Sequence, residues 1–210
     1  SVLTLTRGED QAASRAAHEE HETLRQLRGA MKASGYDALV AFSQDNVTYA
    51  AGFLVPSHVT NRFRRTIAIL AGDDFSAQIV VNVEEAQAVA RSRFADIRPY
   101  NQFTEHPSDL LADALIEAGV ERGNIAIELD FMPAADFLRL QKRLPHATFH
   151  ECKELFFRAR MIKTDEEIGI LRRVGVLTER VIHDVLGEIK VGMTEIDVAR
   201  RLVDQMIAGG

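Results

Sequence analysis

The sequence contains one cysteine, Cys152, in 210 residues. A single cysteine excludes an intrachain disulfide and a metal cluster held by several thiolates. No apolar run approaches the roughly 20 residues that a membrane-spanning helix needs. The first six residues, Ser-Val-Leu-Thr-Leu-Thr, lack the basic and long apolar regions of a signal peptide. We therefore expect a cytoplasmic protein that does not bind a membrane.

The chain also lacks an excess of positive charge. It has 25 Lys and Arg against 31 Asp and Glu, which gives a net charge of −6 and argues against nucleic acid as the main partner. It has no Gly-x-x-x-x-Gly-Lys loop, no Gly-x-Gly-x-x-Gly after a strand and no Gly-x-Ser-x-Gly motif. These absences remove the simple nucleotide-binding and serine-hydrolase interpretations. The apolar fraction of 46% is ordinary for a globular protein with a substantial core.

Alternating strand and helix patterns indicate an α/β domain. The patterns predict strands at residues 37–43, 66–71, 75–83, 96–100, 124–129 and 147–150. They predict helices within residues 9–34, 84–94, 107–119 and 133–144, and a short helix that Asp45 caps and Gly52 ends. The turn Gly72-Asp73-Asp74 joins two of the strands into a hairpin, which makes the sheet mixed rather than all parallel.

Two capped amphipathic helices close the sequence. Thr164 is a good N-cap residue and Glu167 follows three residues later, as in a capping box. Apolar residues then recur at helical spacing from Ile168 to Val185. The segment Thr194-Glu-Ile-Asp197 predicts a second capping box, before a helix that stops at Gly209-Gly210. Each helix has one apolar face that needs a partner, so we expect them to begin a second, incomplete domain.

Several segments resemble the creatinase, prolidase and aminopeptidase P family. Residues 160–168 together with residues 192–199 resemble the start of its pita-bread domain, and Asn46–Phe53 resembles its Asn-x-x-Tyr-x-x-Gly-Phe element. The resemblance runs from about Leu24 to the C-terminus. It implies a mixed-sheet N-terminal α/β domain with a ribonuclease H-like motif at residues 1–157. The first helices of a truncated pita-bread α+β domain would follow at residues 158–210.

The resemblance also implies a function. The family holds two divalent metal ions (manganese, cobalt or zinc) with two aspartates, a histidine and two glutamates of the pita-bread domain. Those motifs would follow residue 210, so we expect this chain to be the inactive N-terminal part of an Xaa-Pro dipeptidase or aminopeptidase P, with no metal ligand or catalytic residue of its own. One alternative is a creatinase-like hydrolase of amidino or amide compounds, and another is a non-catalytic protein that binds partners. The resemblance implies a homodimer that acts on a small peptide or amidino substrate.

The loop at residues 58–65 is the best candidate for substrate binding. It contains three arginines in four positions, and a guanidinium suits bidentate capture of a carboxylate. In the resembled family this loop can lean over the active site, often that of the partner subunit. We therefore predict that His58, Arg62 and Arg64 contact the substrate. The alternative is that the arginines only keep the edge of a strand soluble.

Two histidine groups have metal-ligand chemistry but weak patterns. On a helix, His18, His21 and Glu22 would share one face, but they lie in a polar leader and do not match His-Glu-x-x-His. The second group has the even spacing of residues that face one way on a strand: His146, His150 and Cys152. No fourth ligand accompanies the second group, so we interpret both groups as polar surface residues.

We predict that the 210-residue chain has no specific site for a divalent metal ion. Calorimetric titration with manganese, cobalt and zinc should show no stoichiometric binding, because no complete ligand set can be assembled from the sequence. Micromolar binding that His21→Ala abolishes would show instead that the first histidine group is a metal site.

Overall fold

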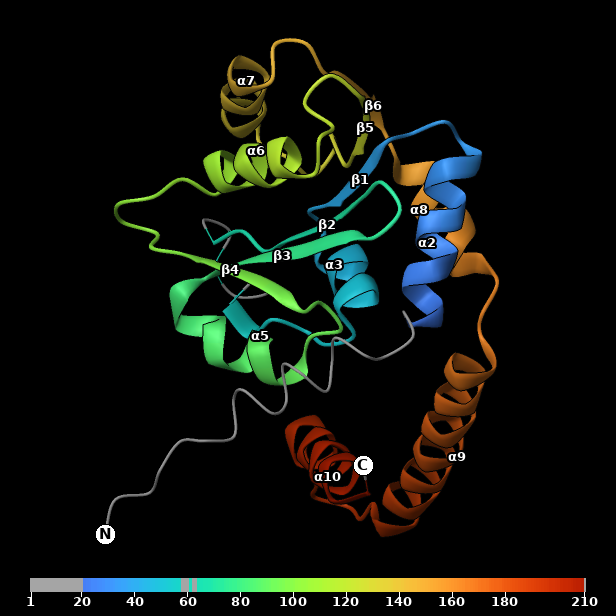
Figure 1. The fold of residues 1–210 in the computed structure, drawn as a ribbon. Coiled ribbons are helices and arrows are strands. Elements are labelled where there is room, and N and C mark those ends of the chain that lie inside the picture. Colours follow the sequence, from blue (N-terminus) through green and yellow to red (C-terminus); the bar gives the residue numbers. More distant parts are fainter. Residues whose placement is uncertain (1–20, 58–60, 62–63, 210) are drawn as a thin grey trace, which may run out of the picture. The chain divides into compact units, whose positions relative to one another are not determined.

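The structure is a computed structural model, and it describes residues 21–57, 61 and 64–209. The chain divides into two compact units, Ser1–Met161 and Ile162–Gly210 (Figure 1). The first unit contains a β-sheet covered by helices, and the second is a pair of helices. No helix in the described part of the chain combines the length and the apolar composition needed to cross a membrane.

A six-stranded mixed sheet forms the centre of the first unit, in the order β4-β3-β2-β1-β5-β6. Its strands are β1 (Ala38–Ala41), β2 (Ile67–Ala71), β3 (Phe75–Val81), β4 (Asp96–Tyr100), β5 (Asn124–Ile127) and β6 (Thr148–Glu151). Strand β2 is antiparallel to both of its neighbours, whereas the other neighbouring pairs are parallel. The predicted hairpin and mixed sheet are thus confirmed. The carboxyl ends of five strands meet the amino end of β2 at one end of the sheet, which we call the carboxyl end.

Helices cover both faces of this sheet (Figure 1). On one face, α6 (Pro107–Glu117) and α7 (Ala134–Arg143) contribute to an apolar cluster that includes Val40, Leu111 and Leu140. On the other face lie α2 (Glu22–Ala33), α3 (Gln44–Ala51), α5 (Glu85–Arg91) and α8 (Lys153–Met161), with a one-turn 3₁₀ helix η1 (Asn82–Glu84) before α5. The neighbouring strand residues Leu39 and Val40 belong to opposite clusters, because successive strand side chains point to opposite faces.

Two local features differ from the sequence prediction. The N-cap of α3 is Ser43, whose hydroxyl accepts from the backbone N–H of Asn46 at 3.2 Å, so the prediction of Asp45 as the cap was wrong. The helix ends as predicted at Gly52, which has φ of 79°, a left-handed conformation that glycine adopts without strain. Helix α8 was not predicted, and it spans the expected domain boundary at residue 157.

A buried carboxylate joins three elements at the carboxyl end of the sheet. Glu128, directly after β5, is 2% exposed and accepts hydrogen bonds from the backbone N–H groups of Phe42 and Ser43 at 2.7 and 2.8 Å. Its second oxygen accepts from the side-chain amide of Asn46 at 2.6 Å. The amide oxygen of Asn46 in turn accepts from Arg160 of α8 at 3.0 Å. This chain of hydrogen bonds holds β1, α3 and α8 against β5.

The second unit consists of α9 (Asp165–Glu188) and α10 (Glu195–Gly209), which pack against each other. The predicted capping box is confirmed, because Thr164 and Glu167 exchange side-chain and backbone hydrogen bonds. Thr194 and Asp197 make the same reciprocal pair before α10. Several large apolar side chains of these helices are exposed, including Leu171, Val174, Val176, Ile196 and Ile207.

Replacing Glu128 should destabilise the first unit strongly. Glu128→Ala would leave two backbone N–H groups and the Asn46 amide without an acceptor, which should lower the free energy of unfolding by about 3 kcal/mol or more. Urea unfolding measures this change. Glu154→Ala is the matched control, because Glu154 makes an exposed pair with Arg158 that is worth at most about 0.5 kcal/mol. Equal stability of the two variants would contradict a central role for Glu128.

Candidate functional site

The predicted substrate-binding loop leads into β2 at the carboxyl end of the sheet. His58 and Arg62 lie outside the described residues, so their roles stay predictions. Arg64 and its neighbour Arg65 are described, and both are partly buried. Arg64 has its side-chain partner in the segment after β4, and Arg65 has its partner in the first turn of α7. The two arginines therefore differ in what holds their side chains.

Arg65 is tied into the fold. Its guanidinium Nε donates to Asp136 of α7 at 3.0 Å, and the two side chains are only 20% and 12% exposed. Its backbone N–H donates to the phenolic oxygen of Tyr100 at 2.7 Å. Burial raises the pKa of Tyr100, although this hydrogen bond and the positive charges of the two arginines partly oppose that increase. An arginine whose charge is matched by a nearly buried carboxylate stabilises structure and has little charge left for a ligand.

Arg64 is held by a neutral group. Its Nε donates to the side-chain oxygen of Gln102 at 2.9 Å, and its backbone N–H donates to the carbonyl of Asn61. Among the described residues, no carboxylate forms an ion pair with Arg64, and no other side chain hydrogen-bonds its guanidinium. The two terminal nitrogens therefore remain able to donate to a carboxylate in the bidentate manner that suits arginine.

A tight turn after β4 presents Gln102. The backbone N–H groups of Thr104 and Glu105 donate to the carbonyl of Asn101 at 3.1 and 2.8 Å. The side chain of Asn101 accepts from the backbone of Phe103, and the carboxylate of Glu105 accepts from the backbone of Asn101. These four hydrogen bonds fix the backbone on both sides of Gln102, so its amide is directed at Arg64 by a preformed turn.

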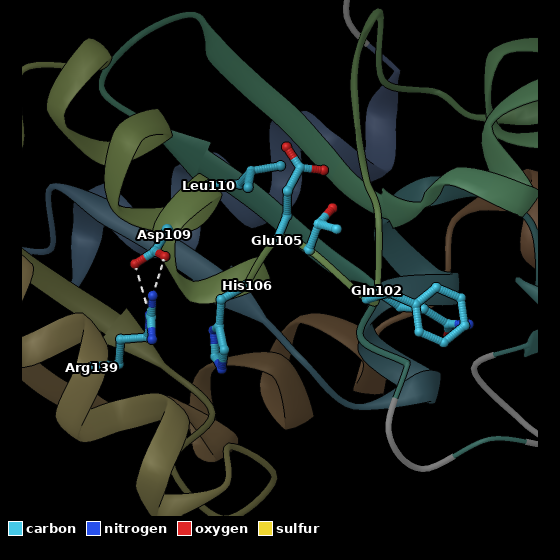
Figure 2. A pocket seen from close by; sticks show the side chains of 8 residues that line it. Gln102, Glu105, His106, Asp109, Leu110 and Arg139 are labelled. Carbon is cyan, nitrogen blue, oxygen red and sulfur yellow. Dashed lines mark hydrogen bonds and ion pairs between the residues drawn. The ribbon is translucent and has the colours of Figure 1, made fainter.

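This turn also forms one wall of an open pocket of about 460 Å³. Figure 2 shows Gln102, Glu105 and His106 on the segment that leads into α6, with Arg139 of α7 on another side. Asp109 accepts two hydrogen bonds from Arg139 at 2.9 and 2.6 Å, and these bonds lower the pKa of the Asp109 carboxyl (Figure 2). The pocket therefore lies beside the Gln102 that holds Arg64, and it has both polar and charged walls.

His106 links this pocket to the anchored arginine. It is the N-cap of α6, and its Nδ1 accepts from the backbone N–H of Ser108 at 3.2 Å. Its Nε2 lies 3.8 Å from the Asp136 carboxylate that holds Arg65. The first turns of α6 and α7 are thus connected to Arg65, the last residue of the loop at residues 58–65, which we call the arginine loop.

Two of the histidines considered as metal ligands, His21 and His150, have other partners. His21 is the N-cap of α2 and accepts from the backbone of Thr23, while His18 lies outside the described residues. His150 lies against the ring of Tyr36, and burial raises the pKa of the Cys152 thiol well above its usual range.

Among residues 21–57, 61 and 64–209, no three His, Cys, Asp or Glu side chains come together to hold a metal ion. This part of the chain therefore offers no ligand set for the two divalent ions that the resemblance implies. No reaction step can be assigned to a metal from these residues. What they offer is Arg64, a partly buried arginine whose guanidinium is held by a neutral amide.

The residues that decide the site were not predicted. Gln102 and Asp136 lie 38 and 71 positions along the chain from their arginines, and neither belongs to a motif. The sequence indicated only the end of a strand at Tyr100, and Gln102 lies in the turn that follows it. That pattern alone could not pair either residue with the loop.

The chain is similar to known proteins over most of its length. The family described as Creatinase/Prolidase N-terminal domain matches residues 24–162. A creatinase from a Bacillus species is 24% identical over 86% of this chain and 43% of its own length, and an Xaa-Pro dipeptidase from Lactobacillus helveticus is 27% identical over 76% and 42%.

A solved structure agrees with the fold. An Xaa-Pro dipeptidase from Bacillus anthracis superposes with a TM-score of 0.71 at 21% identity, over 91% of this chain and 50% of that one. The chain spans about half the length of the curated relatives that it matches.

The two neighbouring arginines should respond differently to substitution. Arg65→Ala leaves Asp136 as a nearly buried carboxylate without its guanidinium, which should cost about 1.5–3 kcal/mol of folding free energy. Arg64→Ala removes one hydrogen bond to a neutral amide, so we expect a change of about 0.5 kcal/mol or less. Urea unfolding of the two variants side by side measures the difference. A larger loss for Arg64→Ala than for Arg65→Ala would contradict these assignments.

Proposed function

Because this chain belongs to the creatinase/prolidase N-terminal domain family, we propose that it is the substrate-orienting N-terminal part of a metal-dependent hydrolase, most specifically an Xaa-Pro dipeptidase or aminopeptidase. The match confirms the resemblance seen in the sequence. In this proposal the chain contributes binding groups, and the metal ligands and catalytic groups belong to a further part of the protein. Its relatives, about twice as long as the matched region, support that division.

The geometry of Arg64 carries the proposal. A dipeptide that ends in proline has a carboxylate close to the bond that is cleaved. Arg64 has two guanidinium nitrogens that no described residue occupies, and its other edge is fixed by Gln102. A fixed cation of this kind can hold the substrate carboxylate and so orient the peptide bond, which is the usual contribution of a positioning arginine to catalysis. His58 and Arg62 are proposed as further substrate contacts of the same loop.

A creatinase-like reaction is the second candidate. The similarity to a creatinase over 86% of this chain favours it. Creatine also has a carboxylate, so Arg64 suits both substrates and does not distinguish them. Release of proline from Xaa-Pro dipeptides, measured beside consumption of creatine by the same preparation, separates the two functions.

We further propose that the full-length protein is a homodimer in the cytoplasm, in which the arginine loop serves the active site of the partner subunit. The resemblance to the family supports this arrangement. Mixed dimers provide the test. One subunit carries a loop variant with an intact metal site, and the other carries an intact loop but lacks metal ligands. Together they should form one complete active site.

Replacing Arg64 should impair substrate use without impairing folding. In the full-length protein, Arg64→Ala should lower kcat/KM for an Xaa-Pro dipeptide about ten-fold or more, since a hydrogen bond to a charged group contributes about 1.5–3 kcal/mol to binding. The melting temperature should stay nearly unchanged. Steady-state kinetics and thermal unfolding of the same samples measure both quantities.

Arg158→Ala is the matched control for this prediction. Arg158 is another arginine of the same unit, but it makes an exposed ion pair with Glu154 on α8. Its loss should leave the kinetics of the enzyme unchanged. If Arg64→Ala is equally silent, Arg64 is only a surface residue and the proposed substrate contact is wrong.

A further inference from the structure

We propose that Gln102 is a positioning residue, whose neutral amide orients the guanidinium of Arg64 and leaves the charge of Arg64 available for the substrate. This inference rests on the proposed function, because it assumes that Arg64 binds a substrate carboxylate. It adds a residue outside the arginine loop to the groups that determine substrate binding. That residue follows β4, whereas the arginine loop precedes β2, and β3 lies between these two strands.

The hydrogen bond to Gln102 restricts how Arg64 can bind an anion. A guanidinium has two edges that can donate a pair of parallel hydrogen bonds, one of which includes Nε. Because the Nε of Arg64 donates to Gln102 at 2.9 Å, a carboxylate can form its bidentate contact only with the two terminal nitrogens. Gln102 therefore selects which edge of the arginine faces the substrate.

The neutrality of Gln102 matters as much as its position. The neighbouring Arg65 donates through the same atom, Nε, to the carboxylate of Asp136, and its charge is thereby matched within the fold. An amide accepts a hydrogen bond without contributing a charge. The contrast between the two arginines shows that the chain uses a carboxylate where it fixes structure and an amide where the positive charge stays uncompensated.

The acidic side chains of the turn after β4 and of the first turn of α6 have other hydrogen-bond partners. The nearest acidic residues in sequence on this turn and on α6 are occupied, since Glu105 accepts from the backbone of Asn101 and Asp109 accepts from Arg139. Within the described residues, Gln102 is thus the side chain through which the turn after β4 acts on Arg64. Any disturbance of that turn reaches the arginine through one hydrogen bond.

The test compares two Gln102 variants with an Arg64 variant in the full-length protein. The substrates are an Xaa-Pro dipeptide and the matched Xaa-Pro carboxamide, which lacks the terminal negative charge. The main readout is the ratio of kcat/KM for the carboxylate to kcat/KM for the carboxamide. A general loss of structure lowers both values and leaves their ratio unchanged, whereas a misdirected Arg64 lowers the ratio.

We expect the ratio to fall about three-fold or more in Gln102→Ala, chiefly through a higher KM for the carboxylate substrate. Gln102→Glu should lower it about ten-fold or more, because the new carboxylate pairs with Arg64 and repels that of the substrate. In combination with Arg64→Ala, Gln102→Ala should change the ratio by less than about two-fold, since residues that act through one another are not additive.

The outcomes separate the inference from the proposed function. If Arg64→Ala leaves the ratio unchanged, the proposed substrate contact is wrong, and the inference is overturned with it. If Arg64→Ala lowers the ratio but both Gln102 variants keep the normal ratio, Arg64 binds substrate without help from Gln102. If the effects of Arg64→Ala and Gln102→Ala multiply in the double variant, Gln102 acts on the substrate by another route. Either of these last two results overturns the positioning role alone.

Discussion

The carboxylate of Glu128 is the interaction on which the first unit depends. A buried charge is costly to remove from water, and it is stable only when hydrogen-bond donors replace the lost hydration. Here two backbone N–H groups and the amide of Asn46 supply those donors. Because Asn46 also accepts from Arg160, the same carboxylate determines where α3 begins and where α8 lies. The carboxyl end of the sheet is therefore rigid at its centre, next to the strand that the arginine loop precedes.

The hydrogen-bond networks around Glu128 and around Arg64, both at this carboxyl end, differ from each other. Around Glu128, both carboxylate oxygens and both polar atoms of the Asn46 side chain have hydrogen-bond partners within the fold. Around Arg64 the network stops at a neutral amide. Open α/β sheets bind ligands beyond the carboxyl ends of their strands, because loops from several strands converge there on one place. A closed network beside an open one is the arrangement expected where a rigid scaffold supports a binding group.

The sequence predicted the features that depend on neighbouring residues. The hairpin of β2 and β3, the helix end at Gly52 and the capping box of Thr164 and Glu167 all depend on contacts within a few positions, so local patterns were sufficient. The error at Asp45 arose because two polar residues separated by one position, Ser43 and Asp45, can both cap a helix, and only the backbone conformation determines which of them does. Helix α8 was missed because only Leu155 and Phe156 are buried in its nine residues, too few to produce a periodic pattern.

The site could be predicted only in part, for a related reason. Composition identified the arginine cluster and its suitability for a carboxylate, and the family resemblance supplied a role for it. Which arginine keeps an open guanidinium depends on partners that lie 38 and 71 positions away in the chain. Asp136 and Gln102 are ordinary residues of a helix and a turn, and no motif marks them. The difference in hydrogen-bond partners between two adjacent arginines is thus a property of tertiary structure. It follows from whether the fold brings a carboxylate or an amide to each one.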